Sequence, residues 1–551
     1  MWLVLGLLVS SAADVPNFVV FFADDMGAGD TSLSGHPTLS TPNIDRLALE
    51  GLRFTQWYSG FHVCSPSRAS MMTGRLPIRA GVTGDWTGGV FSSVAVAGLP
   101  LNETTWAQTL KAEGYRTMAV GKWHLGQRPE YLPTRRGFDE YLGIPYSVDM
   151  GRSAWRLDTT QPPLPLLANE TVLEQPVNLN TLSQRYVDAA EAFVLDEGRF
   201  ALYYAFSHVH VPDFASPQFC NASRRGLFGD AIAEMDWSLG QVKARTPRNT
   251  LTFFTSDNGP WLIERLKGGS AGLFFEGKQT TWEGGVREPA IIHWPGVIEP
   301  GGIRRALTAT YDIFATILGA AGIAPPDDRV IDGVDLRPLF ARDGQVRDCV
   351  FIYKGRPDSC GGDDDYPSCP GLWAVRCGPY KAHFATSYTA GTCQGAHNVS
   401  RIGSSCTAPV VLDTPLLFNV EVDPSEKWPI DATSDEYQTA LATILAAKTA
   451  HETELGEPPR DQILLGSNID YAVCGCPESQ ASLPQWPNCT CNPENWLLAV
   501  CAPPNGDSPY AYVDDLGLLE EKNEEEEPVP ILEDTVRHAD YFEATHGWRP
   551  Y

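Results

Sequence analysis

The sequence has few basic residues and no long apolar run. It contains 41 lysines and arginines against 68 aspartates and glutamates, which gives a formal net charge of −27. Nucleic-acid binding needs a basic surface, so this balance argues against nucleic acid as a partner. An anionic small substrate is still compatible, because the local charge of a pocket can oppose the net charge. No stretch reaches the ~18 uninterrupted apolar residues that would predict a membrane span.

Cysteine is scarce in the first 348 residues, where only Cys64 and Cys220 occur, and the rest of the 13 cysteines follow. This late clustering predicts disulfides formed in an oxidising compartment. Zinc is the alternative interpretation of paired cysteines such as Cys474 and Cys476. Their CxC spacing is unlike the CxxC spacing of zinc sites, which disfavours that alternative.

The N-terminus indicates secretion. Residues 2–9 are apolar and residues 10–13 are small, which is typical of a signal peptide cleaved after residue 13, although no basic residue precedes the apolar run. The alternatives are a first β-strand or a truncated start. We expect a protein of the secretory pathway, either lysosomal or extracellular. Five N-x-S/T glycosylation sequons favour the same destination, and they start at Asn102, Asn169, Asn221, Asn398 and Asn488.

Buried strands alternate with helices through the first 345 residues. The apolar run at 17–23 is typical of a strand buried in a parallel sheet, and further strands are predicted at 116–121, 200–206, 250–255 and 290–294. Helices are predicted at 42–51, 104–113, around 182–193, around 232–239 and at 311–321, with Thr41 as the N-cap of the first. The Pro-rich segment 150–180 is predicted to be a loop. The pattern predicts an α/β domain over residues 14–345 with a large, mostly parallel sheet flanked by helices.

The pattern changes near residue 345. Short strands are predicted at 350–353, 372–376, 381–384 and 416–420, followed by a helix from 436 to about 455. These elements indicate a smaller C-terminal α+β domain with an antiparallel sheet and disulfides, over residues 346–502. Residues 503–551 form an acidic tail with runs of glutamate, which is expected to be solvated and disordered.

Unusual polar residues follow four of the predicted strands. Ligand sites in open α/β sheets lie at the carboxyl ends of the strands, so we expect these residues on one rim of the sheet. Each one alone is compatible with a structural polar group. Lys122 and His124 are two residues apart and would point the same way in an extended chain. The set is Asp24 and Asp25, Lys122 and His124, His210, and Asp257 and Asn258.

The residue types in this set indicate a pocket for a tetrahedral oxyanion. Carboxylate and amide oxygens are hard ligands that suit Ca²⁺ or Mg²⁺ rather than zinc, and Asp24, Asp25, Asp257 and Asn258 supply them. Positively charged donors and a general acid would complete such a pocket, and the candidates are Lys122, His124, His210 and Lys278.

Residues 64–68 (CSPSR) are predicted to begin a short helix that ends at Gly74. Cys64 would then lie at the helix N-terminus, with Arg68 one turn further on the same side. That setting activates a nucleophile or holds an anion. The alternative is a buried structural cysteine beside a surface arginine.

The residues 64–68 (CSPSR) and 72–75 (MTGR) resemble the signature of the sulfatase family, in which the cysteine is oxidised to formylglycine. Four further motifs match in the family's order, at 24–27 (DDMG), 121–126 (GKWHLG), 256–259 (SDNG) and 284–289 (GGVREP). Residues 143–147 and 166–169 are similar to arylsulfatase A, whereas 277–281 and 423–438 are more similar to N-acetylgalactosamine-6-sulfatase. The resemblance implies an alkaline-phosphatase-like fold with a mixed sheet.

The resemblance also implies a role for each matching residue. Ca²⁺ would be held by Asp24, Asp25, Asp257, Asn258 and the modified Cys64, with Mg²⁺ as the alternative ion. Arg68 would hold the modified side chain, and His124 would handle the proton of the formylglycine hydrate. The sulfate would contact Lys122, Lys278, Ser147 and His210, with His208 as the rival of His210.

The predicted function is therefore hydrolysis of sulfate esters, of arylsulfatase type, acting on a sulfated carbohydrate or glycolipid. A formylglycine-generating enzyme would be needed as a maturation partner, and the resemblance is compatible with a homodimer. One alternative is a phosphatase or phosphodiesterase of the alkaline phosphatase superfamily, whose substrates are also tetrahedral oxyanions. The other is a non-catalytic relative that binds sulfated glycans.

Overall fold

A computed structural model describes residues 15–85, 89–151, 163–357, 371–388 and 409–473 of the protein. The expected signal peptide, Asn398, Asn488, the cysteine-rich stretch 474–501 and the acidic tail lie outside these residues. Among the described helices, none has the length and apolar character needed to cross a membrane.

The centre of the structure is a ten-stranded sheet, in which four neighbouring strands position the site. Their order is β9 (Thr250–Ser256), β1 (Asn17–Ala23), β8 (Phe200–Ala205) and β4 (Arg116–Gly121), and each pairs with its neighbour in parallel. In β1, Phe21 pairs with Tyr204 on one side and with Phe254 on the other. Residues 18–23 have no exposed surface, as expected for a strand covered on both faces.

The remaining strands make the sheet mixed. β10 (Ala290–His293) runs antiparallel to β9 and leads to β2 (Leu52–Phe54) and β11 (Gly302–Arg304) at one edge. At the other edge lie β5 (Glu140–Gly143), β6 (Leu166–Ala168) and β7 (Thr171–Glu174). The prediction of a loop over 150–180 is wrong where β6 and β7 form this edge hairpin. The expected large, mostly parallel mixed sheet is confirmed.

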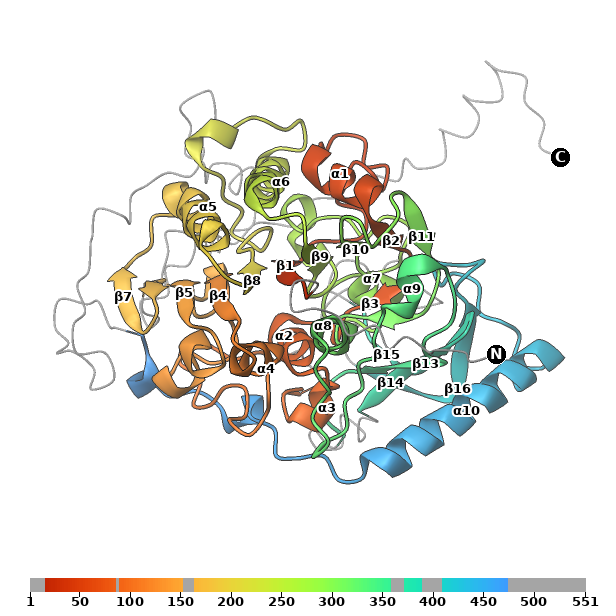
Figure 1. Ribbon diagram of the computed structural model, residues 1–551. Helices are drawn as coiled ribbons and strands as arrows, with labels where there is room; N and C mark the ends of the chain where they lie inside the picture. Colours follow the sequence, from red (N-terminus) through yellow and green to blue (C-terminus); the bar gives the residue numbers. More distant parts are fainter. Residues whose placement is uncertain (1–14, 86–88, 152–162, 358–370, 389–408, 474–551) are drawn as a thin grey trace, which may run out of the picture. The chain divides into compact units, whose positions relative to one another are not determined.

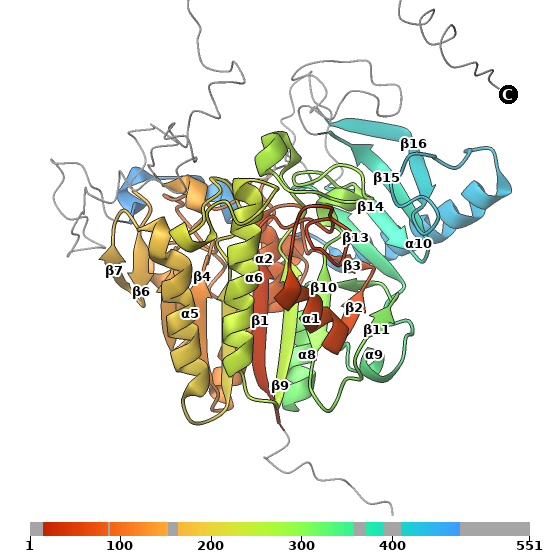
Figure 2. The same cartoon turned by 90° about the horizontal axis from the view of Figure 1, so that it is seen from above.

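Helices cover both faces of the sheet (Figures 1 and 2). One face carries α1 (Pro42–Glu50), α5 (Leu179–Leu195) and α6 (Leu227–Arg245), and the other carries α2 (Cys64–Thr73), α4 (Trp106–Ala112) and α8 (Asp312–Ala321). Shorter elements are α3 (Pro77–Ala80), α7 (Glu283–Val286), α9 (Pro338–Ala341) and the paired β3 (Trp57–Tyr58) and β12 (Thr308–Ala309). Short 3-10 helices occur at Pro129–Tyr131, Pro133–Arg135, Val148–Met150, Pro217–Phe219, Leu262–Lys267, Ile463–Leu465 and Ile469–Tyr471.

Helix starts differ from the predictions in two places. The Thr41 side chain does not cap α1, because its hydroxyl donates to Asp45 Oδ1 at 2.8 Å instead of accepting from the helix backbone. The helix predicted from residue 104 begins at Trp106. Thr105 and Gln108 form a capping box there, in which each side chain satisfies the other's backbone N–H.

A second sheet of four antiparallel strands follows the large one. It consists of β13 (Cys349–Tyr353), β14 (Leu372–Cys377), β15 (Tyr380–Thr386) and β16 (Val410–Asn419). α10 (Asp435–Leu455) packs against β14 and β15. A disulfide between Cys349 and Cys377 links β13 to β14, and Cys220 is also disulfide-bonded. The predicted antiparallel C-terminal sheet and the use of disulfides are confirmed.

Candidate functional site

The four strand ends predicted to carry function meet at one rim of the sheet. Asp24 and Asp25 follow β1, Lys122 and His124 follow β4, His210 lies beyond β8, and Asp257 and Asn258 follow β9. The backbone N–H of Asp25 donates to Asp257 Oδ1 at 3.1 Å, across 232 residues of sequence. All of these side chains are buried. The sheet order explains the convergence, because β9, β1, β8 and β4 are consecutive parallel strands.

Helix α2 brings Cys64 to the same rim. The helix begins at Cys64 and ends at Gly74, which adopts a left-handed conformation with φ of 70° and donates its N–H to Ser70. The Cys64 Sγ lies 3.6 Å from Asp24 Oδ1 and 3.5 Å from Lys278 Nζ. The predicted position of Cys64 at a helix N-terminus is therefore present.

Arg68 lies one turn further along α2 and is fully buried. Its guanidinium lies 2.8 Å from Asp257 Oδ2 and 3.2 Å from Asp24 Oδ1, and it also donates to the hydroxyl of Tyr203. The alternative of a surface arginine is therefore wrong. Arg68 joins the acids that follow β1 and β9 and holds them against α2.

Burial raises the pKa of the Cys64 thiol well above its ordinary value, although the charges of Lys122 and Lys278 act in the opposite direction. A thiol held in this way remains protonated near neutral pH and is a poor nucleophile. The surroundings of Cys64 therefore do not favour chemistry by the thiol itself.

Lys122 and Lys278 place two ammonium groups on either side of the carboxylates. Lys122 Nζ lies 2.7 Å from Asp24 Oδ2, and Lys278 Nζ lies 2.7 Å from Asp25 Oδ2. Burial would lower the pKa of each lysine, but the nearby carboxylates outweigh it and the pKa of both is raised. Both lysines are therefore positively charged.

The backbone conformation of His124 differs from the predicted one. Its backbone is left-handed, with φ of 58°, so the prediction that an extended chain aligns it with Lys122 is wrong. Its Nε2 lies 2.9 Å from the Phe91 carbonyl, whereas Nδ1 has no partner among the described residues. Burial and the charge of Lys122 lower the pKa of His124 well below its ordinary value, so the ring is neutral. A neutral imidazole can accept a proton.

The two candidate histidines after β8 lie in different surroundings. His210 Nε2 lies 3.0 Å from Lys278 Nζ and 3.5 Å from Asp25 Oδ2, inside the cluster. His208 instead packs on Phe214, with its Nε2 3.6 Å from Glu234 Oε2. The structure thus brings His210, and not His208, to the rim.

Asp149 was not among the predicted site residues, but its Oδ1 lies 3.8 Å from His210 Nδ1. Asp149 lies in the 3-10 helix Val148–Met150, directly after the fully buried Ser147. The available sequence signal was that Asp149 lies two residues after Ser147, a predicted sulfate contact. A single acidic residue in a loop is too common to predict a functional role.

The acidic residues of the site fit a hard divalent cation. Ligand atoms of Asp24, Asp25, Asp257 and Cys64 all lie within 4.8 Å of one another. The Nδ2 of Asn258 donates to Asp25 Oδ1 at 2.7 Å, while its buried Oδ1 has no hydrogen-bond partner among the described residues. An orphaned buried carbonyl beside three carboxylates is the donor set that Ca²⁺ or Mg²⁺ requires.

A buried ionic network that was not predicted from the sequence connects α7 to the second sheet. Glu283 in α7 accepts from Tyr58 and Lys381, and Lys381 lies 3.2 Å from Glu426. Lys381 and His383 alternate along β15 and so face the same side of the sheet. This alternation of charged residues in a buried strand was the sequence signal for the network.

The chain is similar to known proteins over most of its length. A family model described as Sulfatase matches residues 16–323, and a model for the C-terminal region of aryl-sulfatase matches residues 345–491. Human arylsulfatase A is 39% identical over 521 residues, covering 86% of this chain and 99% of the relative. Mouse N-acetylgalactosamine-6-sulfatase is also 39% identical, over 505 residues that cover 86% of this chain and 93% of the relative. The crystal structure of the PsFucS1 sulfatase from Pseudoalteromonas sp. matches with a TM-score of 0.68 at 28% identity, covering 81% of this chain and 92% of that one.

Proposed function

The chain belongs to the sulfatase family and is a sulfuric ester hydrolase, and from this premise we propose that it acts through a formylglycine made from Cys64 beside a bound Ca²⁺. The observation that supports the proposal most directly is the position of Cys64. It lies at the start of α2, among three carboxylates, two lysines and Arg68. Its burial makes it a poor thiol nucleophile, so a precursor role accounts for a cysteine at this position.

An aldehyde hydrate at position 64 would supply one hydroxyl to attack sulfur and a second hydroxyl whose deprotonation releases sulfate. His124 would accept the proton of that second hydroxyl, because its ring is buried and neutral. Arg68 would hold the side chain of residue 64. A serine at the same position could attack sulfur but would remain as a stable sulfate ester.

The sulfate group would lie between Lys122 and Lys278 and contact Ser147 and His210. Lys278 Nζ and His210 Nε2 are 3.0 Å apart, so both can approach one oxygen of the substrate. Either group could donate the proton that the leaving alcohol oxygen requires. The Asp149 carboxylate faces the other ring nitrogen of His210 at 3.8 Å and would help to orient that ring.

Asp24, Asp25, Asp257, Asn258 and residue 64 would hold the cation. Bound Ca²⁺ would offset negative charge on the sulfuryl oxygens, and Mg²⁺ is the alternative ion with the same ligand preference. The lysines and Arg68 already balance the three carboxylates, so the site can be assembled before the ion binds.

We infer that the substrate is a sulfated carbohydrate or glycolipid. The name of the mouse relative specifies a sulfated amino sugar, and most of its length aligns with this chain. The asparagines of the three sequons in the described residues, Asn102, Asn169 and Asn221, are exposed, as glycan attachment requires. We further propose that the protein passes through the secretory pathway to a lysosome or the cell exterior. A formylglycine-generating enzyme would mature it on the way, and the mature protein would form a homodimer.

The decisive experiment is mass spectrometry of the peptide that contains residue 64, from protein purified from its native host. We expect the mass of formylglycine in place of cysteine. Unmodified cysteine in all of the native protein would contradict the proposal. A matched pair of sulfate and phosphate monoesters of one phenol tests the phosphatase alternative, because preferential cleavage of the phosphate would favour that alternative.

A further inference from the structure

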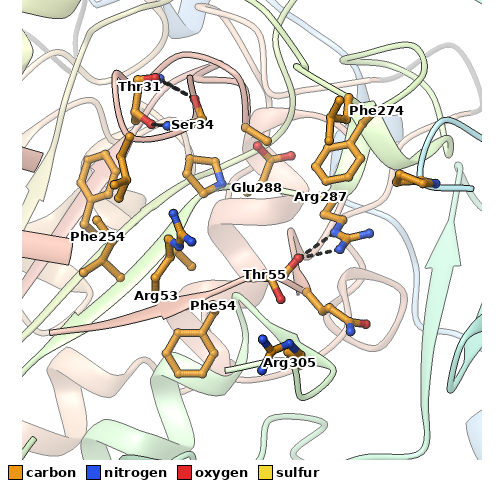
Figure 3. Close-up of a pocket in the computed structure, with 18 of the residues that line it drawn as sticks. Thr31, Ser34, Arg53, Phe54, Thr55, Phe254, Phe274, Arg287, Glu288 and Arg305 are labelled. Atoms are coloured by element: carbon orange, nitrogen blue, oxygen red, sulfur yellow. Dashed lines mark hydrogen bonds between the residues drawn. The ribbon is translucent and has the colours of Figure 1, made fainter. Parts of the chain in front are cut away.

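Apart from the catalytic rim, the structure contains a pocket with a volume of about 560 Å³ (Figure 3). Its walls come from β2, the loop after Asp25, the segments 273–274 and 287–291, and the segment after β16. None of the residues proposed for catalysis or metal binding lines it. The pocket is therefore distinct from the site described above, and its volume falls within the range of small-molecule pockets.

Arg53 of β2 supplies an unpaired positive charge to this pocket. The other two arginines of the wall have partners: Arg287 lies 2.8 Å from Glu283 and Arg305 lies 3.8 Å from Asp343. The half-buried guanidinium of Arg53 forms no hydrogen bond or ion pair with any residue that the structure describes. A partly desolvated guanidinium gains most from an anion that accepts its parallel N–H groups.

Glu288 supplies an unsatisfied polar group to the same pocket. Its residue is 3% exposed, and neither carboxylate oxygen has a hydrogen-bond partner in the described structure. Leaving a buried polar group without a partner costs free energy, so a ligand that hydrogen-bonds to it would gain affinity. Burial raises the pKa of the Glu288 carboxyl well above its ordinary value, so the group can act as a neutral donor or acceptor.

Aromatic side chains form the apolar part of the wall. Phe54, Phe254 and Phe274 surround the cavity, and the guanidinium of Arg287 lies 4.5 Å from the centre of the Phe274 ring. Apolar side chains with a few polar groups are typical of sites for small organic ligands. The positive charge of Arg53 adds a preference for an anion over a neutral compound.

We propose that this pocket binds a small organic anion with an apolar, ring-containing body, such as an aromatic sulfonate, sulfate or carboxylate. Arg53 contacts the anionic group, Glu288 hydrogen-bonds to a hydroxyl or amine of the ligand, and the phenylalanines pack against its rings. The site is separate from the catalytic rim, so the proposal does not depend on formylglycine or on the bound cation.

The test uses anilinonaphthalene sulfonate, a fluorescent apolar anion whose carbon–sulfur bond a sulfate-ester hydrolase cannot cleave. We expect saturable binding to the full-length protein, and roughly tenfold weaker binding to the Arg53→Gln variant, the loss expected for one charge-assisted hydrogen bond. Arg46→Gln, an exposed residue of α1 outside the pocket wall, is the control and should bind like the wild type.

A neutral probe, N-phenylnaphthylamine, separates the charge of Arg53 from a general change of the pocket. We expect its binding to be the same in the wild type and in Arg53→Gln. Equal binding of the sulfonate to both proteins, or an equal loss of both probes in the variant, would overturn the proposal.

The rate of methylumbelliferyl sulfate hydrolysis in the presence of the sulfonate shows whether the sulfonate binds in the pocket or at the catalytic rim. We expect no competitive inhibition at sulfonate concentrations that saturate the fluorescence signal, and an unchanged rate in Arg53→Gln. Competitive inhibition that is equally strong in both proteins would place the sulfonate at the catalytic rim and refute the second site.

Discussion

The ammonium group of Lys381 in β15 lies 3.0 Å from Oε1 of Glu283 in α7, and both side chains are fully buried. This pair joins the second sheet to the short helix that follows Lys278, across 98 residues of sequence. Burial would raise the pKa of Glu283, but the charges of Lys381, Arg287 and Arg376 outweigh it and lower the pKa strongly. The C-terminal sheet thus helps to fix the position of the segment that carries a proposed sulfate ligand.

Lys381→Met should destabilise the protein by about 3 kcal/mol, at the lower end of the cost of breaking a buried ion pair. The lower end is expected because Arg287 and Arg376 still compensate Glu283 after the substitution. Urea unfolding followed by tryptophan fluorescence measures the loss. Lys448→Met, which removes the partly exposed pair with Glu452, is the control and should cost less than about 0.5 kcal/mol. Equal effects of the two variants would contradict a stabilising role for the buried pair.

Cys64→Ser should abolish turnover or leave a sulfated enzyme after one reaction. The serine hydroxyl can attack sulfur, but it lacks the second hydroxyl that releases sulfate. Rapid-quench mass spectrometry of the variant with a sulfate ester would detect an added sulfate on residue 64. Circular dichroism and the unfolding midpoint control for folding. Multiple turnovers at the wild-type rate would refute the formylglycine mechanism.

Asp257→Ala should reduce the bound Ca²⁺ after dialysis, because it removes one of the three clustered carboxylates. Elemental analysis of the dialysed protein measures the ion directly and does not depend on activity. Asp139→Asn, a change at a partly exposed acid paired with Lys111, is the control and should keep the ion. An unchanged Ca²⁺ content in Asp257→Ala would remove this residue from the proposed ligands.

Acidification should destabilise the packing of α10 through His451. The His451 ring stacks on Phe351 and pairs with the hydroxyl of Tyr353 at 2.8 Å. Burial lowers the pKa of His451 from 6.5 to about 4, so between these values the unfolded chain binds more protons than the folded one. Stability therefore falls as pH decreases from 6.5 to 4, by up to roughly 3 kcal/mol from this group.

The His451→Gln variant isolates this contribution. At pH 7.5 the variant should be less stable than the wild type, because the stacked ring is lost. At pH 4.5 the difference should shrink or reverse, because only the wild type loses stability by protonating the buried ring. Urea unfolding midpoints at both pH values measure the change. A difference that does not vary with pH would contradict a neutral, buried His451.

Much of the fold was predictable because its signals are local. The segments 17–23, 116–121, 200–206 and 250–255 form strands at nearly the predicted bounds, and their short, largely apolar sequences are typical of strands covered on both faces. Gly74 ends α2 for a similar reason, because its left-handed conformation suits glycine. The polar residues after these strands were also predictable as one site, since parallel neighbours end at the same rim.

The partners of individual side chains depend on tertiary structure. The residues alone predicted that Cys64 begins a helix and that the acids after β1 and β9 lie on one rim of the sheet. Only the folded chain decided that His210 and not His208 contacts Lys278, and that Asp149 lies near His210. It also decided that His124 has a left-handed backbone and that Lys381 pairs with Glu283. Periodicity fixes which face of an element a residue occupies. The distance between side chains on separate elements is set by how those elements pack, and no local pattern in the sequence records it.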